Sequence, residues 1–317
     1  MPRHLNIITN SSANTYLTCP RKYRFRYVDN IVPRSEYMPF AFGTAGHAWL
    51  ERFWLAGENN PVSLSDPFEQ AKLRAMLRGY SLRWSEWLEN DVDVTGCEIE
   101  FRVPLINPDT GAKSPAWEVC GKLDAFGKIG GRYLVGEHKF TSDAGVGYFE
   151  RLRIDSQIST YLMGCKAKGL PEPEGVLYDV LKKPQIRPFK RTENPKLKKD
   201  GSLMANQHAA DETPDEYELR CFEAIAEKPE EYYQHALCVR LDSEVTEAAR
   251  DMWFIAGMIR VSMNENRWPR NTQSCRNQYQ KFCEYWPICT GECSVTDTIR
   301  FEKRRPFEEL SEGLTET

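Results

Sequence analysis

A glutamate and a lysine stand two residues apart in the stretch GRYLVGEHKF (131–140), which otherwise has the pattern of an apolar β-strand. Side chains alternate between the two faces of a strand, so Glu137 and Lys139 point from the same face, which also carries Tyr133 and Val135. An isolated Glu-x-Lys is more often an exposed ion pair on a strand surface. The interpretation therefore depends on the residues around it.

A second acid, Asp124, lies near the end of the preceding extended segment, WEVCGKLDAFGKI (117–129). A glycine-rich turn follows, so the two segments are predicted to form a hairpin, whose register decides whether Asp124 and Glu137 meet. Two carboxylates in one half-buried site repel each other, and a divalent cation such as Mg²⁺ or Mn²⁺ relieves that cost. With Lys139 to orient or deprotonate water, these groups fit metal-assisted hydrolysis of a phosphodiester.

Three further residues could complete such a site. His47, in FGTAGHAWLE, stands early in a predicted helix, where its imidazole could bind a metal ion. Gln157 and Tyr161, in SQISTYLMG, are four residues apart on another predicted helix and therefore share a face. Taken singly, each is more simply a packed or surface side chain. Their combination with the acids and the lysine points to a site.

In order and spacing, four short motifs resemble those of RecB-like nucleases of the PD-(D/E)XK superfamily: GTAGH (43–47), GKLD (121–124), EHK (137–139) and QISTY (157–161). The sequence is similar here to the nuclease domains of bacterial helicase–nucleases and to CRISPR-associated RecB-like exonucleases, over residues 11–293. The superfamily's usual Pro-Asp is replaced by Leu123-Asp124. The resemblance implies a role for six residues: a metal site of His47, Asp124 and Glu137, a catalytic lysine, Lys139, and two residues that position the DNA or the site, Gln157 and Tyr161.

The composition, 41% hydrophobic and 28% charged, is that of a soluble globular protein. We expect a reducing, cytosol-like compartment, in which the ten cysteines do not form a disulfide framework. The best apolar run, MWFIAGMI (252–259), is too short to cross a bilayer, and the first residues do not resemble a signal peptide. We expect a cytoplasmic protein, in a bacterial cell or a phage-infected host, with no membrane partner. The net charge of −4 neither indicates nor excludes nucleic-acid binding.

Four cysteines crowd into the C-terminal segment SCRNQYQKFCEYWPICTGEC, a pattern that indicates metal binding in an intracellular chain. Their spacing matches neither a zinc ribbon nor a ferredoxin. RecB-like nucleases that resemble this chain carry one cysteine before the nuclease core and three after it, around a [4Fe–4S] cluster. The resemblance thus implies four cluster ligands, with Cys293 left over: Cys19, Cys275, Cys283 and Cys289. A local zinc site without Cys19 is the alternative.

Two basic clusters stand out. The first, RKYRFRY (21–27), interleaves Arg21, Lys22, Arg24 and Arg26 with three aromatic rings, as a single-stranded nucleic-acid surface does. The alternative is that the rings pack inward and the cations are solvated. The second cluster begins at Lys182 and Lys183 and continues to residue 199; it could clamp the substrate backbone or be an ordinary solvated loop.

Hydrophobic periodicity predicts helices over 11–28, 43–58, 66–90, 152–168, 215–229 and 243–267, and strands over 97–106, 117–129, 131–140, 175–182 and 232–241. The first helix is expected to be capped by Ser11 or Ser12 and broken near Pro20. This order predicts an α/β fold, a mixed central sheet flanked by helices. The resemblance adds a PD-(D/E)XK restriction-endonuclease-like core and an Fe–S cluster that joins the N- and C-terminal segments.

One RecB-like nuclease domain is expected over residues 1–300. Its parts are a helical segment (11–92), the nuclease core (97–182), a basic inserted loop (183–215), a helix-and-strand segment (216–267) and a cysteine-rich segment (268–293). Residues 301–317 are expected to be a disordered tail.

The sequence therefore predicts a metal-dependent DNA nuclease with a structural [4Fe–4S] cluster. We expect exonuclease action on single-stranded DNA or DNA ends, leaving a 5′-phosphate and a 3′-hydroxyl, in recombination, repair or phage DNA processing, with a helicase or recombination protein as a further partner. The alternatives are a non-catalytic DNA-end-binding module and a zinc-stabilised structural protein.

Overall fold

A six-stranded mixed sheet forms the centre of the protein. The structure, a computed structural model, describes residues 6–34, 38–276, 281–305, 307 and 310. The strands are β1 (Asn6–Ile8), β3 (Val92–Ile106), β4 (Lys113–Ile129), β5 (Arg132–Thr141), β6 (Val176–Lys182) and β7 (Tyr233–Cys238). The pairs β1–β4 and β5–β6 are parallel, while β3–β4, β4–β5 and β6–β7 are antiparallel.

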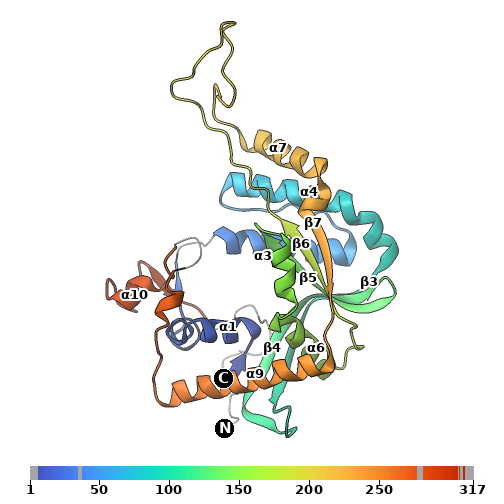
Figure 1. Cartoon of the computed structure of the whole chain (residues 1–317), viewed down its shortest axis with the longest axis vertical. Helices are drawn as coiled ribbons and strands as arrows, with labels where there is room; N and C mark the ends of the chain where they lie inside the picture. The colour runs from blue at the N-terminus through green and yellow to red at the C-terminus, as the bar shows by residue number, and fades with distance from the viewer. Residues whose placement is uncertain (1–5, 35–37, 277–280, 306, 308–309, 311–317) are drawn as a thin grey trace.

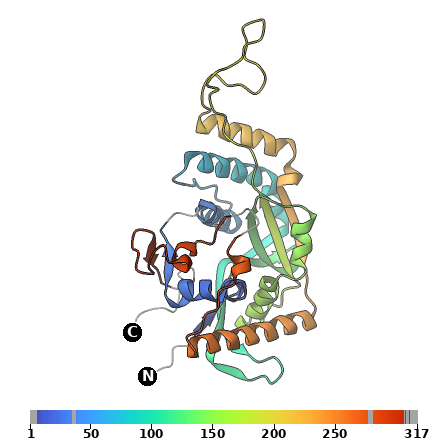
Figure 2. The ribbon, with the colours of Figure 1, turned by 60° about the vertical axis from the view of Figure 1, so that its left-hand side comes forward.

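Helices cover both faces of this sheet (Figures 1 and 2). One face packs against α3 (Met38–Ala56), α4 (Pro67–Asp91) and α7 (Pro214–Glu227), and the other against α1 (Asn10–Thr18), α6 (Ser156–Lys168) and α9 (Asp242–Asn264). Alternation along β6 explains the two layers, since Tyr178 and Val180 enter the α6–α9 core and Leu177 and Leu181 the α3–α4 core. The expected α/β fold is confirmed.

Strands β4 and β5 separate at the position of the two acids. They pair from Ile129–Arg132 as far as Ala125–Gly136. Beyond that point β5 continues beside β6, whereas β4 continues beside β3 and meets β1 over Trp117–Val119. Asp124 and Glu137 are the first residues past the last β4–β5 pair. They therefore lie at a fork in the sheet, where two strands diverge and leave space between them.

The N-terminal helix is broken where the proline predicts. Helix α1 ends at Thr18, and α2 (Pro20–Tyr23) begins at Pro20 and continues into a π-helical turn, Arg24–Val28. The predicted cap at Ser11 or Ser12 is wrong. Thr9 is the cap, and its hydroxyl accepts a hydrogen bond from the Ser12 amide (3.1 Å).

The predicted helix over 152–168 is two helices, α5 (Val146–Leu152) and α6, joined by a short turn. Asp155 ends that turn, because its side chain caps α6 by accepting from the Gln157 amide (2.9 Å). The inserted loop after Lys182 extends away from the body, beyond α7 (Figure 1). A short antiparallel bridge between Leu197 and Leu203 closes its outer part.

The end of the described chain contradicts the expected disordered tail. Strand β8 (Phe301–Lys303) pairs with β2 (Ile31–Pro33), and Phe301 is buried. An apolar residue at 301 and an available edge on β2 explain the pairing. Part of 301–317 lies outside the described residues. The remaining short elements are α8 (Pro229–Tyr232), a 3₁₀ turn (Thr272–Ser274) and α10 (Trp286–Thr290). None of the described helices is long and apolar enough to cross a membrane.

Helix α3 lies so close to β5 that Gly46 has no room for a side chain. A Cβ on Gly46 would come within 2.3 Å of the Phe140 ring, whereas a Cβ on Gly43, in the same helix, would meet nothing within 4 Å. Gly46→Ala should therefore lower the free energy of unfolding by about 1–3 kcal/mol through overpacking.

Urea denaturation measures this effect, and Gly43→Ala is the matched control. The control should leave stability unchanged or raise it by up to about 1 kcal/mol, because alanine favours a helix over glycine. Equal effects of the two substitutions would contradict the close approach of α3.

Candidate active site

Asp124 is the centre of a group of side chains at the fork. Its Oδ2 lies 3.3 Å from Nδ1 of His47, on α3, and accepts a hydrogen bond from the His138 amide (2.8 Å). Burial alone would raise the pKa of Asp124, but the charge of His47 and its hydrogen bond lower it to about 2. Burial would likewise lower the pKa of His47, and the charge of Asp124 raises it. The acid is thus a carboxylate held beside an imidazole.

Glu98 is a third member of this group, and the sequence did not reveal it. Ligand atoms of His47, Glu98 and Asp124 lie within 4.8 Å of one another, close enough for all three to bind one cation. Cys97 pairs with Ala125 and Ile99 with Leu123, so Glu98 stands opposite Asp124 across the β3–β4 ladder. Its backbone φ of 51° is unusual for a glutamate, and its carboxylate forms an ion pair with Lys122.

Glu137 and Lys139 form a second, adjoining group with two residues of α6. Lys139 Nζ contacts Glu137 Oε1 and donates to Gln157 Oε1 (3.2 Å). Gln157 Nε2 donates to Glu137 Oε1 (3.0 Å), and the Tyr161 hydroxyl donates to Oε2 (2.7 Å). The side chain of Glu137 is only 2% exposed, and both of its carboxylate oxygens accept hydrogen bonds. The four-residue spacing of Gln157 and Tyr161 does place them on one helix face.

The charges of the two groups are coupled. Burial and the neighbouring Asp124 carboxylate raise the pKa of Glu137. Burial would lower the pKa of Lys139, but Glu137 and Asp124 raise it above its ordinary value, so the amine is an ammonium. In this state Lys139 can donate a hydrogen bond to water or to a phosphate oxygen.

A buried hydrogen-bond network contacts the face of β5 opposite to Glu137 and Lys139. His138, between the two catalytic candidates in sequence, packs against the Trp54 ring of α3 (4.8 Å between ring centres), and its Nδ1 lies 2.8 Å from Oδ2 of the fully buried Asp179. The same oxygen accepts from the Tyr80 hydroxyl (2.5 Å), which in turn accepts from Trp54 Nε1 (2.9 Å). The strand segment is therefore fixed by buried hydrogen bonds on both faces.

Four of the five cysteines near the ends of the chain line one small pocket. It is bounded by Cys19, Cys275, Cys283 and Cys289 together with Lys22, Arg270 and two aromatic residues. The Cys283 amide donates to the Cys275 carbonyl (2.9 Å), which ties two of them together. Cys293 does not line this pocket, although it packs against the Phe25–Tyr285 cluster as Cys283 and Cys289 do. In the described residues, no three cysteine sulfurs lie within 4.8 Å of one another.

The first basic cluster is largely used within the protein. Arg21 Nε donates to the Trp268 carbonyl (2.9 Å), Lys22 pairs with Glu284 (2.8 Å), and Arg24 with Asp29 (3.2 Å). Tyr23 and Phe25 are buried, so the expectation that these two rings stack on bases is wrong and the inward-packing alternative holds for them. Arg26 lies 5.7 Å from the centre of the Tyr27 ring.

Lys182 and Lys183 stand at the start of the inserted loop. Lys183 lies over the Phe42 ring (4.1 Å), and burial lowers the pKa of its amine. This lysine is thus partly engaged within the fold, while Lys182 is half-buried at the end of β6. The more distal lysines of the loop are the exposed ones.

The family model for the PD-(D/E)XK nuclease superfamily matches residues 8–290, and the chain belongs to this superfamily. Its members are generally nucleases that use divalent metals, and the group of His47, Glu98 and Asp124 is a candidate metal site. Among solved structures, the chain is similar to one titled "Crystal structure of SSO0001", at 13% identity and a TM-score of 0.31, over 80% of this chain and 79% of that one. A search of curated proteins finds no significant match.

The hydroxyl of Tyr161 should stabilise the buried Glu137 carboxylate. Tyr161→Phe removes that hydrogen bond and should lower the free energy of unfolding by about 1.5–3 kcal/mol, the usual range for a bond to a charged group.

Tyr178→Phe is the control for this measurement, again by urea denaturation. Tyr178 is also buried in the α6–α9 core, but its hydroxyl has no hydrogen-bond partner within the described residues. Removing it should be neutral or stabilising. A loss for Tyr178→Phe as large as that for Tyr161→Phe would contradict the assignment.

Proposed function

We propose that the chain is a Mg²⁺- or Mn²⁺-dependent deoxyribonuclease that hydrolyses phosphodiester bonds of single-stranded DNA or DNA ends. The observation that carries this proposal is the fork itself, where the group of His47, Glu98 and Asp124 adjoins the Glu137–Lys139 pair. His47, Glu98, Asp124 and Glu137 would hold the metal, since oxygen and imidazole ligands suit these ions. When bound, the ion supplies Lewis-acid polarisation of the phosphate and a more acidic water.

The chain's own residues would do the rest. Lys139 would donate to the attacking water or to a phosphate oxygen and offset the charge that develops there. Gln157 and Tyr161 would keep the Glu137 carboxylate in one orientation, so that the cation and the lysine face the same phosphate. The products would carry a 5′-phosphate and a 3′-hydroxyl.

Binding of DNA would use cations near the site. The loop that follows Lys182 and Lys183 carries further exposed lysines at 190, 196, 198 and 199, suited to phosphate contacts. Arg21, Lys22, Arg24 and Arg26 remain a second candidate surface through their charge. Recombination, repair or phage DNA processing in the cytoplasm, with a helicase or recombination partner, rests on the RecB-like resemblance alone.

Hydrolysis should depend on the fork residues. Asp124→Asn, Glu137→Gln and Lys139→Ala should each reduce Mn²⁺-dependent cleavage of labelled single-stranded DNA by about 10²–10⁴-fold, because each removes a charge from the reacting centre. EDTA should stop cleavage by the unaltered protein.

Lys128→Ala, on the exposed side of the same hairpin, is the matched control and should cleave normally. Circular dichroism checks that the variants fold. Full activity in all three fork variants would exclude this site, and DNA binding without any cleavage by the unaltered protein would favour a DNA-end-binding module.

We further propose that Cys19, Cys275, Cys283 and Cys289 hold a structural [4Fe–4S] cluster. These four line one pocket, whereas Cys293 does not. Such a cluster would join residues more than two hundred positions apart, and its binding energy would then stabilise the fold.

Two serine substitutions separate the cluster from local zinc. In the cluster arrangement, Cys19→Ser should remove iron and visible absorbance from anaerobically purified protein and lower its thermal stability, while Cys293→Ser should change neither. A local zinc site of the four C-terminal cysteines would give the reverse pattern, with zinc retained in Cys19→Ser and lost in Cys293→Ser. Elemental analysis and visible spectra distinguish the two.

A further inference from the structure

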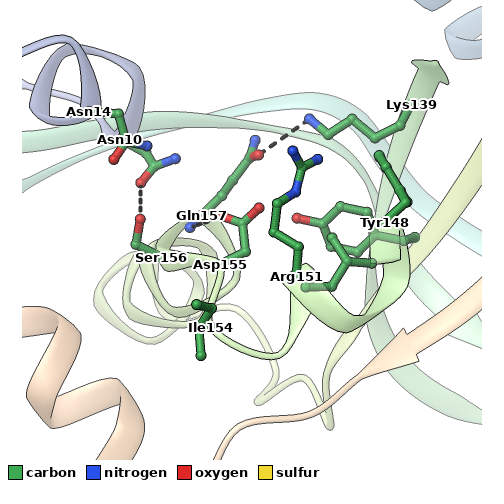
Figure 3. A pocket seen from close by; sticks show the side chains of 11 residues that line it. Asn10, Asn14, Lys139, Tyr148, Arg151, Ile154, Asp155, Ser156 and Gln157 are labelled. Atoms are coloured by element: carbon green, nitrogen blue, oxygen red, sulfur yellow. Dashed lines mark hydrogen bonds between the residues drawn. The ribbon is translucent and has the colours of Figure 1, made fainter. Parts of the chain in front are cut away.

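A pocket of about 470 Å³ opens beside the fork, between β5, α1 and the α5–α6 turn (Figure 3). Lys139 and Gln157 form one wall, so the pocket adjoins the proposed scissile position. The volume lies within the range of about 300–1,000 Å³ that is typical of small-ligand sites. An occupant of this pocket would therefore lie next to the bond that is cut.

Arg151 supplies an available positive charge to the pocket. Its guanidinium packs over the Tyr148 ring at 5.0 Å, and none of the described carboxylates lies within ion-pair distance of it. Figure 3 shows the heads of Arg151 and Lys139 pointing into the same space. Two cations that converge repel each other, and an anion between or beside them relieves that repulsion.

Two amides line the opposite wall. Asn10 and Asn14 are four residues apart on α1 and share a face. Asn10 Oδ1 accepts from the Ser156 hydroxyl (2.7 Å), which leaves its NH₂ group to donate to an occupant. Amide donors suit the ring nitrogens and carbonyls of nucleobases. Asp155 is the acidic residue among those that line the pocket, and its Oδ1 accepts a hydrogen bond from the backbone amide of Gln157.

We propose that this pocket binds one unpaired nucleotide adjacent to the scissile phosphate, with the next phosphate of the strand on Arg151 and the base toward Asn10 and Asn14. The base must be unpaired, because a base stacked and paired within a duplex cannot enter a pocket of this size. This inference rests on the proposed nuclease function for the identity of the scissile position, and it predicts a preference for single strands.

Equilibrium binding tests the inference apart from hydrolysis. Binding of a single-stranded oligonucleotide of about 12 nucleotides, with a 3′ fluorophore, is followed by anisotropy in EDTA at several salt concentrations. Arg151→Gln should weaken binding about tenfold. It should also make the slope of log K against log [salt] shallower by about 0.7, the value for one lost phosphate contact on a single strand.

Arg153→Gln is the matched control. Arg153 lies two residues away, is 78% exposed by its side chain and pairs with Glu150 (3.3 Å) outside the pocket. It should leave both affinity and slope unchanged. For a duplex of the same sequence, the Arg151 effect on affinity should be smaller.

The outcomes separate this inference from the proposed function. An unchanged slope for Arg151→Gln, or equal effects of Arg151→Gln and Arg153→Gln, would overturn the pocket assignment even if the protein cleaves DNA. An Arg151-dependent slope in a protein that does not cleave with Mn²⁺ would support the pocket and refute the nuclease. Failure of the unaltered protein to bind single strands would overturn it outright.

Discussion

The desolvation of two neighbouring carboxylates is the constraint on which this structure depends. Glu137 is almost fully removed from water and Asp124 largely so at the point where β4 and β5 part, and removing ions from water costs several kcal/mol each in a protein interior. Three surrounding elements supply polar or charged groups that offset this desolvation cost. Helix α3 brings an imidazole, β5 brings an ammonium, and α6 brings a phenol and an amide. Each helix layer thus contributes to the electrostatics of one small region.

The two faces of β5 carry different side chains, and the hydrogen bonds on both faces hold the strand in place. On one face Glu137 and Lys139 take part in the site, and on the other His138 is bonded to the buried Asp179 and through it to Tyr80. Because the backbone amide of His138 also donates to Asp124, this one residue joins the rear network to the acid in front. A rigid strand is what a reaction needs when small displacements of catalytic groups lower the rate.

Local sequence patterns were enough for the hairpin, the main helices and the shared face of Gln157 and Tyr161, because these depend on periodicity and turn residues. The features that were missed depend on pairing between distant segments. Glu98 meets Asp124 only through the register of a long antiparallel ladder, and β8 forms only because β2 offers an edge. The inward packing of Tyr23 was equally hidden, because its partner Trp268 is far along the chain.

The pairing of β2 with β8 has a consequence for synthesis on the ribosome. Residues 31–33 leave the exit tunnel early, yet their partners at 301–303 are made about 270 residues later. Until then, the edge of β2 and the apolar surface that Phe301 covers stay uncovered in the nascent chain. Pairing between segments so far apart in sequence slows folding, and the intermediate that precedes it exposes apolar surface and is prone to aggregate. We therefore expect chaperone binding and premature proteolysis of the nascent chain to concentrate in this region.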